Sequence, residues 1–264
     1  MARSEGNFGF TGSLGNLTAY KRQGSNKVIL RTKGGASKNK IRRSPKFARL
    51  RLCQTEFGAC STLGALIRHS IWGIKHLADS YISGHLNAFL KSILNQDTEN
   101  KPGQRAILVS RYRNLFNGFN LNRQNPFNTV MRHPVSCTLS RDTGTASITI
   151  PQLLPGMGFY NPSKYPMYRF IVVLSVIPDM AFAKKQYEPV SASRLFPEYH
   201  FTEWKDSSLP AAMQNIELRL KDFKGLTDSN SLFLSMGIEF GYPVSNAVTK
   251  AVKYTGSACI LSAG

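Results

Sequence analysis

The sequence predicts an α+β protein with an N-terminal β-hairpin arm, a small helical block and a C-terminal antiparallel β-sandwich. Strand patterns punctuated by glycine occupy residues 1–35, and apolar residues recur at helical spacing from about residue 44. After residue 119, alternating apolar runs stand between turn-forming residues. We therefore expect three segments: a basic hairpin arm and linker over residues 1–43, the helical block over 44–119 and the sandwich over 120–264.

The arm is predicted as a hairpin of two strands, Leu14–Lys21 and Lys27–Thr32, joined by a loop that contains Gly24. Gly34 and Gly35 end it. A two-stranded hairpin is only marginally stable in water, so we expect the arm to dock on its own domain or on a neighbouring subunit. The apolar side chains expected to make that contact are Leu14, Leu17, Tyr20, Val28 and Leu30.

Three helices are predicted to follow the arm. Residues 36–43 lack apolar periodicity and are expected to form the linker. Ser44 and Pro45 suit the N-cap and first position of a helix, and apolar residues continue at helical intervals to Ile67. Two further helical patterns cover about residues 74–95 and 102–115.

The C-terminal segment reads as strands. Val135–Ser140 and Ala146–Ile150 flank a turn-forming Asp-x-Gly, the pattern of a β-hairpin. Tyr168–Ile177 is a nearly continuous apolar run, typical of a strand buried on both faces. Other strand patterns are Ile216–Leu220, Ser231–Tyr242 and Ala258–Leu261. Such spacing predicts a sandwich of six to eight strands.

The formal net charge of +19 is unevenly distributed. Residues 1–51 hold thirteen Lys or Arg and one acid, and residues 101–141 hold seven Lys or Arg and no acid. Residues 142–264, in contrast, are nearly balanced, with eleven Lys or Arg and ten acids. Such blocks usually mark contact with a polyanion or an acidic partner; a solvated face that keeps the protein soluble is the alternative. The basic residues expected to make the contact are Lys33, Lys38, Lys40, Arg42, Arg43, Lys46, Arg49, Arg51, Arg105, Arg111 and Arg113.

Two local patterns bear on this contact. Basic side chains around the start of the helix predicted at Ser44 oppose its macrodipole, which favours an external negative charge. Arginines of residues 105–123 are interleaved with Tyr112, Phe116 and Phe119, a combination that binds single strands by stacking and charge. However, Tyr112 and Phe119 also have the spacing of a buried helix face, which favours core packing.

The sequence gives no pattern of an enzyme. Its five histidines and four cysteines lack metal-ligand spacing, and it contains no nucleophile elbow and no phosphate-binding loop. We therefore predict no catalytic residue, metal, cofactor or small-molecule substrate. No run of 18 apolar residues and no apolar secretory segment is present. A cytoplasmic protein is expected, unless it is exported by another route.

Several N-terminal motifs resemble a family of uncharacterised proteins from Bacteroidota of similar length. They are Gly12-x-x-Gly15-x-x-x-x-Tyr20-Lys21, Arg31-x-Lys33-Gly34-Gly35, Pro45-x-Phe47-x-x-x-Arg51 and Glu56-Phe57-Gly58. The likeness continues at Gly103-Gln104-Arg105 and Gly237-Ile238-Glu239-Phe240. The resemblance implies a shared lineage and a two-part layout, and it transfers no catalytic residue.

Together these patterns predict a non-enzymatic structural protein. We expect it to self-assemble through its arm as a homo-oligomer or polymer, in a filament, a shell or another form. Its basic surface is expected to contact nucleic acid or an acidic partner. The alternative is a nucleic-acid-binding protein that does not polymerise, whose binding would depend steeply on salt.

Overall fold

The computed structural model is an α+β fold, as the sequence predicts, and it describes residues 3–5, 9–22, 27–162, 164–191, 196–245, 248–253 and 255–264. The chain forms two compact units, residues 1–51 and residues 52–264, which we call the arm unit and the body. This grouping differs from the three segments expected from the sequence, because the boundary follows Arg51 and residues 52–264 belong to one unit.

The arm unit begins with a four-stranded antiparallel sheet in the order β1-β2-β3-β4, which we call the arm sheet. Its strands are β1 (Arg3–Glu5), β2 (Gly9–Leu14), β3 (Leu17–Lys21) and β4 (Val28–Thr32). Gly15 and Asn16 turn the chain between β2 and β3, and Gly15 takes the left-handed φ of 54° that such a tight turn requires. The predicted pairing of β3 with β4 is confirmed, whereas residues 23–26 of their loop lie outside the described residues. The prediction of only two strands is wrong, because the turn at Gly15 and Asn16 divides the predicted strand Leu14–Lys21 and two further strands, β1 and β2, precede β3.

The segment predicted as a linker, residues 36–43, contains the short helix α1 (Lys38–Arg43), which the sequence pattern did not indicate. The Ser37 side chain caps it by accepting a hydrogen bond from the Lys40 amide. A 3₁₀ turn over Pro45–Phe47 and the long helix α2 (Ala48–Ser70) follow. The apolar pattern misses α1 because this short helix has no buried residue, so capping, and not core packing, defines it.

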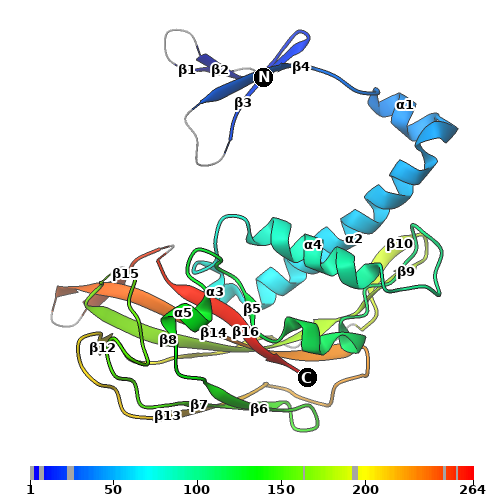
Figure 1. Cartoon of the computed structure of the whole chain (residues 1–264). Coiled ribbons are helices and arrows are strands. Elements are labelled where there is room, and N and C mark those ends of the chain that lie inside the picture. The colour runs from blue at the N-terminus through cyan, green and yellow to red at the C-terminus, as the bar shows by residue number, and fades with distance from the viewer. Residues whose placement is uncertain are drawn as a thin grey trace. The chain divides into compact units, whose positions relative to one another are not determined.

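Two antiparallel sheets of the body form the predicted sandwich (Figure 1), although with ten strands among the described residues, seven in one sheet and three in the other, instead of the six to eight expected. The larger sheet has seven strands in the order β11-β8-β14-β16-β5, with β12 beside β8 and β15 beside β14; the smaller has the order β13-β7-β6. The strands of the larger sheet are β5 (Phe119–Asn120), β8 (Met167–Pro178), β11 (Glu198–Phe201), β12 (Lys205–Asp206), β14 (Asn230–Ser245), β15 (Val248–Ala251) and β16 (Ser257–Ala263). Those of the smaller sheet are β6 (Ser136–Ser140), β7 (Thr145–Ile150) and β13 (Gln214–Arg219). A separate hairpin pairs β9 (Met180–Ala183) with β10 (Gln186–Pro189).

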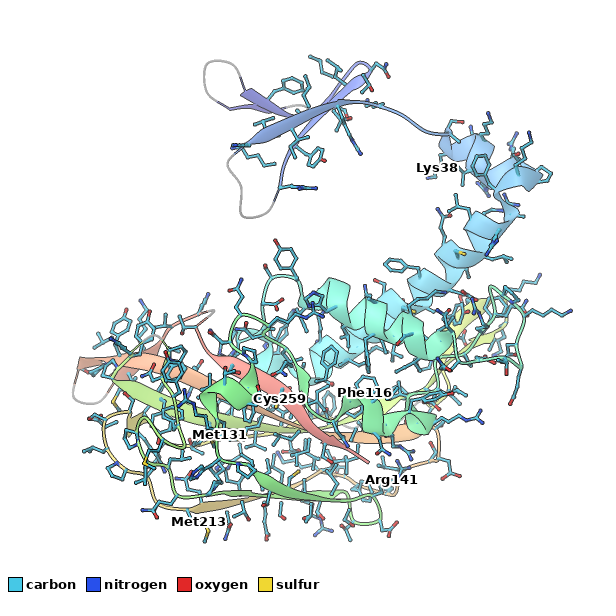
Figure 2. All side chains as sticks on the ribbon, viewed as in Figure 1. Lys38, Phe116, Met131, Arg141, Met213 and Cys259 are labelled. Atoms are coloured by element: carbon cyan, nitrogen blue, oxygen red, sulfur yellow. The ribbon has the colours of Figure 1, made fainter. Side chains whose placement is uncertain are left out.

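Strand β8 is buried along both faces, which confirms the interpretation of its apolar run. Val172 and Leu174 face the core between the two sheets, whereas Ile171 and Val173 face the helices. The seven-stranded sheet therefore divides the apolar interior in two. Figure 2 labels Met131 and Cys259, which belong to the core between the sheets, and Phe116, which belongs to the core on the helix side.

The helix predicted over about residues 74–95 is two helices, α3 (Trp72–Lys75) and α4 (Ile82–Leu94). Between them Asp79 makes hydrogen bonds outside any helix: its amide donates to the Leu121 carbonyl, and its carboxylate accepts from the amides of Tyr81 and Arg123. A short helix α5 (Phe127–Val130) lies further along the chain. The break at Asp79 brings the loop after β5 against α4.

The helix predicted over residues 102–115 is wrong, because this segment forms only 3₁₀ turns over Val109–Arg111 and Arg113–Phe116. Ile107 exchanges backbone hydrogen bonds with Met180 instead of bonding within a helix. The Asp179 carboxylate accepts hydrogen bonds from the amide and hydroxyl of Ser110. Contacts with the sheet thus override the helical spacing of the sequence.

Candidate functional site

The arm sheet has one apolar face. Directly paired residues of antiparallel strands lie on the same face, and the register pairs Leu14 with Leu17, Ala19 with Leu30, and Lys21 with Val28. Leu14, Leu30 and Val28 remain 60%, 56% and 39% exposed, whereas small Ala19 at the centre is buried. This face is therefore apolar and mostly uncovered.

Tyr20 lies on the opposite face of the arm sheet, where it pairs with Ile29. The Arg31 guanidinium lies 5.5 Å from the centroid of the Tyr20 ring, and Thr18 and Ser13 share this face. The five apolar residues expected to act together are thus divided. Leu14, Leu17, Val28 and Leu30 share one face, and Tyr20 belongs to a mixed polar face.

The basic residues that follow the arm sheet are mostly solvent-exposed, and we call residues 38–51 the basic segment. Exposed members are Lys38, Lys40, Arg42, Arg43, Lys46 and Arg49. Two of the predicted residues bond to backbone: Lys33 donates to the Gly15 carbonyl, and Arg51 donates to the carbonyls of Ile41 and Ser44. These two side chains help to hold the arm unit together.

Helix α1 also changes the macrodipole argument. Lys40, Arg42 and Arg43 occupy its last turn, where positive charge interacts favourably with the helix dipole. The unfavourable position expected from the sequence is retained by Lys38 at the start of α1, Lys46 in the 3₁₀ turn, and Arg49 and Arg51 in the first turn of α2. The case for an external anion therefore rests mainly on the density of positive charge and only in part on the dipole.

Arg105 belongs to an ionic cluster inside the body. Its guanidinium donates two hydrogen bonds to the carboxylate of Glu56, which also accepts from Lys91 and from the Gly103 amide. Glu56 is 1% exposed. Burial alone would raise the pKa of Glu56, but the hydrogen bonds from Arg105, Lys91 and Gly103 outweigh it and lower the pKa to about 2. Arg105 is therefore engaged in the fold.

Arg113 is also used internally. It donates to the hydroxyl of Ser231 and to the carbonyls of Asp228 and Asn230, and Arg141 donates to the same Asn230 carbonyl. Burial and the neighbouring Arg141 lower the pKa of Arg113. Arg111, in contrast, is exposed and lines a small hollow whose wall includes Asp97 and Glu99. An anion bound beside Arg111 would therefore be repelled by these two carboxylates.

A second ionic cluster surrounds Glu239, which is 3% exposed on β14. Its two carboxylate oxygens lie 2.5 Å from His76 Nε2 and 2.6 Å from Arg169 Nε. Burial raises the pKa of Glu239, but His76 and Arg169 overcome this and lower it. The Arg169 guanidinium also lies 4.6 Å and 5.1 Å from the ring centroids of Trp204 and Phe201. The cluster joins α3 to the end of the seven-stranded sheet.

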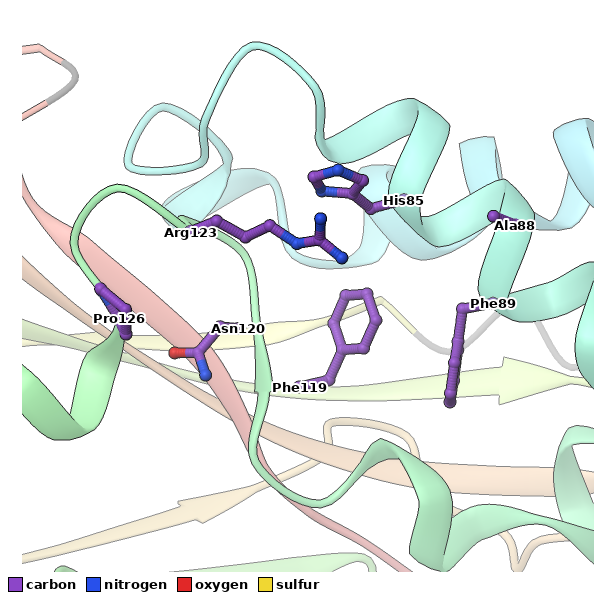
Figure 3. Close-up of a pocket in the computed structure, with 7 residues that line it drawn as sticks. All are labelled: His85, Ala88, Phe89, Phe119, Asn120, Arg123 and Pro126. Atoms are coloured by element: carbon purple, nitrogen blue, oxygen red, sulfur yellow. The ribbon is translucent and has the colours of Figure 1, made fainter.

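An open pocket of about 500 Å³ lies between α4 and the chain around β5 (Figure 3). Helix α4 contributes His85, Ala88 and Phe89, and the chain from β5 contributes Phe119, Asn120, Arg123 and Pro126. In Figure 3 the Arg123 guanidinium extends into the space between His85 and the Phe119 ring. The sequence pattern pointed to Phe119 and the nearby arginines, but it missed His85 and Phe89, which precede Phe119 by 34 and 30 residues.

Within the described part of the chain, no three His, Cys, Asp or Glu side chains form a group that would hold a metal ion. The four cysteines are free, and Cys60 and Cys259 are buried, where burial raises the pKa of each thiol. In the same part of the chain, no helix is both long and apolar enough to cross a membrane.

Comparisons with known proteins do not extend these observations. No protein-family model matches the sequence, and neither the curated proteins nor the solved structures give a match. The resemblance to the Bacteroidota family therefore stays a prediction, and the function is argued from the residues alone.

Proposed function

We propose that this chain is a structural protein that self-assembles through its N-terminal arm. The observation that supports this most directly is the apolar face of the arm sheet, on which Leu14, Leu30 and Val28 remain exposed. Exposed apolar faces rimmed by polar residues are typical of protein–protein contacts. A small sheet with one uncovered face also gains stability when a partner covers it, at about 25 cal/mol per Å² of apolar surface buried.

The partner that fits this face best is the body of another copy. Two arms would repel each other, because residues 1–51 hold thirteen bases and one acid. Residues 142–264 hold eleven bases and ten acids, of which Asp179 and Glu239 are buried, so an arm meets much less repulsion there than at another arm. A contact between an arm and a different surface of the next copy is heterologous, so repeated contacts produce a ring, a filament or a shell.

The basic segment has a separate role in this proposal, which is to contact nucleic acid or an acidic partner face. Its exposed Lys and Arg side chains supply charge without a matching acid anywhere between residues 6 and 55. Phosphate groups would neutralise this charge and release counterions, independently of nucleotide sequence. Such neutralisation would also reduce repulsion between neighbouring arms.

The test separates the two faces of the arm sheet in the full-length protein. The variant Leu14→Thr/Leu30→Thr removes the exposed apolar groups and keeps residues that favour strands. The control Tyr20→Thr changes the opposite face. Multi-angle light scattering after nuclease treatment should find a large particle for the wild type and the control, and a monomer for the double variant. An unchanged particle in the double variant would show that another surface drives assembly.

A second candidate function is a nucleic-acid-binding protein that does not polymerise. The exposed basic segment favours it, since such charge needs no second copy to act. A wild type that stays monomeric with and without nuclease, yet binds nucleic acid with a steep dependence on salt, would select this alternative.

A further inference from the structure

The pocket beside α4 is distinct from the surfaces used in the proposed function. It belongs to the body, and its seven lining residues include no Asp or Glu. Its volume of about 500 Å³ is within the range of ligand sites, about 300–1,000 Å³. Its walls combine two aromatic rings with one arginine and one histidine.

The cation of this pocket is available to a ligand. Among the described residues, the Arg123 guanidinium has no hydrogen bond or ion pair; only its backbone amide is engaged, with the Asp79 carboxylate. Arg105 and Arg113, by contrast, are held by partners within the body. Within the described part of the chain, Arg123 is thus an exposed arginine of the basic stretch 101–141 whose guanidinium lines a pocket without a partner.

The backbone around Arg123 is fixed. The buried side chain of Asn122 donates hydrogen bonds to the carbonyls of Leu77 and Gly256 and accepts from the amides of Gln124 and Asn125. The Asn120 side chain accepts a hydrogen bond from the Phe127 amide. These contacts place the Cα of Arg123 at the mouth before any ligand arrives, which lowers the entropic cost of binding.

The aromatic wall is also held in position. The ring centroids of Phe89 and Phe119 are 5.1 Å apart, and Phe89 packs edge-on against buried Phe116 at 4.9 Å. Both rings remain partly exposed and face the pocket. A planar ring that enters can therefore contact aromatic carbon while a negative group on it meets Arg123.

We infer that this pocket binds a nucleobase–phosphate unit, with the base against Phe89 and Phe119 and the phosphate near Arg123. Aromatic rings bind bases of any sequence through their π-faces, and arginine adds charge and a planar surface. An apolar ligand would leave the guanidinium unused, and an inorganic anion would leave the rings unused. This inference does not depend on assembly through the arm.

The test measures fluorescence anisotropy of a short labelled oligothymidylate with the full-length protein, freed of nucleic acid beforehand. Phe119→Leu and Arg123→Gln should each weaken binding about tenfold, the scale of one base contact. The matched control is Arg132→Gln, which also removes one exposed arginine of the basic stretch, stacked 4.9 Å from Tyr160. Non-specific attraction depends on total charge, so a protein that bound the strand only in this way would lose equal affinity in Arg123→Gln and Arg132→Gln. The inference instead predicts the larger loss for Arg123→Gln.

A further variant blocks the pocket without replacing Phe89, Phe119 or Arg123. Ala88 is exposed on α4 and lines the pocket, so Ala88→Phe fills the space and should weaken binding by a similar factor. Equal binding by wild type, Ala88→Phe and Arg123→Gln, or an equal loss in Arg132→Gln, would overturn the inference.

A competition experiment distinguishes the two possible ligands of the pocket, a free nucleotide and one nucleotide unit of a strand. Thymidine monophosphate that displaces the oligonucleotide, with inorganic phosphate as the comparison, would indicate a site for free nucleotides. Displacement by unlabelled strand alone would indicate a site for one unit of a strand. Light scattering on the same variants should show wild-type mass, so failure here is separate from failure of the assembly proposal.

Discussion

The arm sheet and the seven-stranded sheet of the body differ in how their apolar faces are covered, and the two units differ in how their charges are paired. The body buries apolar side chains on both faces of its seven-stranded sheet and surrounds two of its buried carboxylates, those of Glu56 and Glu239, with cationic partners. The arm sheet leaves Leu14 and Leu30 more than half exposed, and the basic segment adds charge with no acid nearby. The difference agrees with our proposal that a partner covers the arm sheet, whereas the central strands of the body are covered within the chain.

The largest expected effect contrasts a core residue with an arm residue. Phe233 is fully buried on β14, so Phe233→Ala should lower the free energy of unfolding by about 3–5 kcal/mol. Leu30→Ala, on β4 of the other unit, should change the unfolding free energy of the body by less than about 0.5 kcal/mol. Urea unfolding of nuclease-treated protein would measure both. A comparable loss from Leu30→Ala would mean that the stability of the body depends on contacts made by the arm face.

Breaking the ionic cluster of the body should cost somewhat less. Glu56→Gln leaves Arg105 and Lys91 without their carboxylate, and the expected loss is about 2–4 kcal/mol, near the lower end for a buried pair because both cations are partly exposed. The control Glu217→Gln removes an exposed carboxylate from β13. Thermal unfolding should separate the two variants, and equal melting temperatures would show that the cluster contributes little.

The same cluster predicts how stability depends on pH. The folded pKa of Glu56, about 2, lies below its ordinary value of 4.5, so its contribution is present above about pH 4.5 and is lost as pH falls toward 2. Glu239, whose pKa is also lowered, acts in the same direction. Unfolding free energies measured between pH 6 and about 2.5 should fall more steeply for wild type than for Glu56→Gln. Parallel curves would contradict the lowered pKa.

The smallest effect on stability is expected in the basic segment. Replacing Lys38, Lys40, Arg42 and Arg43 by Gln should leave the unfolding of the body unchanged, because these side chains are exposed. It should reduce the slope of binding against salt by about 0.7 for each lost contact with a single strand. Anisotropy at several salt concentrations measures that slope. A slope equal to that of wild type would remove the basic segment from the nucleic-acid contact.

The sequence predicted the fold class well because its strands alternate or run apolar, and burial between layers requires those patterns. It failed at residues 102–115, where the helical spacing of Tyr112, Leu115 and Phe119 gave way to backbone bonds between Ile107 and Met180. It also missed α1, which is defined by the Ser37 cap. Both errors arise where hydrogen bonds, and not apolar packing, determine the backbone.

The candidate sites were predicted in part. Runs of positive charge are visible in sequence, but the partners that engage Arg105 and Arg113 are not, since Glu56 and the carbonyls of Asp228 and Asn230 lie far away in the chain. The pocket of Arg123 likewise needs α4 to supply His85 and Phe89. Contacts between residues far apart in the chain decide which arginines remain available to a ligand, and composition cannot show those contacts.

The most direct measurement is light scattering of the full-length protein, before and after nuclease, for wild type and for Leu14→Thr/Leu30→Thr. We expect a particle of many copies that survives nuclease in the wild type, and a monomer in the variant. A wild-type monomer in both conditions would contradict assembly through the arm. A particle that collapses on nuclease would show that nucleic acid, and not the apolar arm face, holds the copies together.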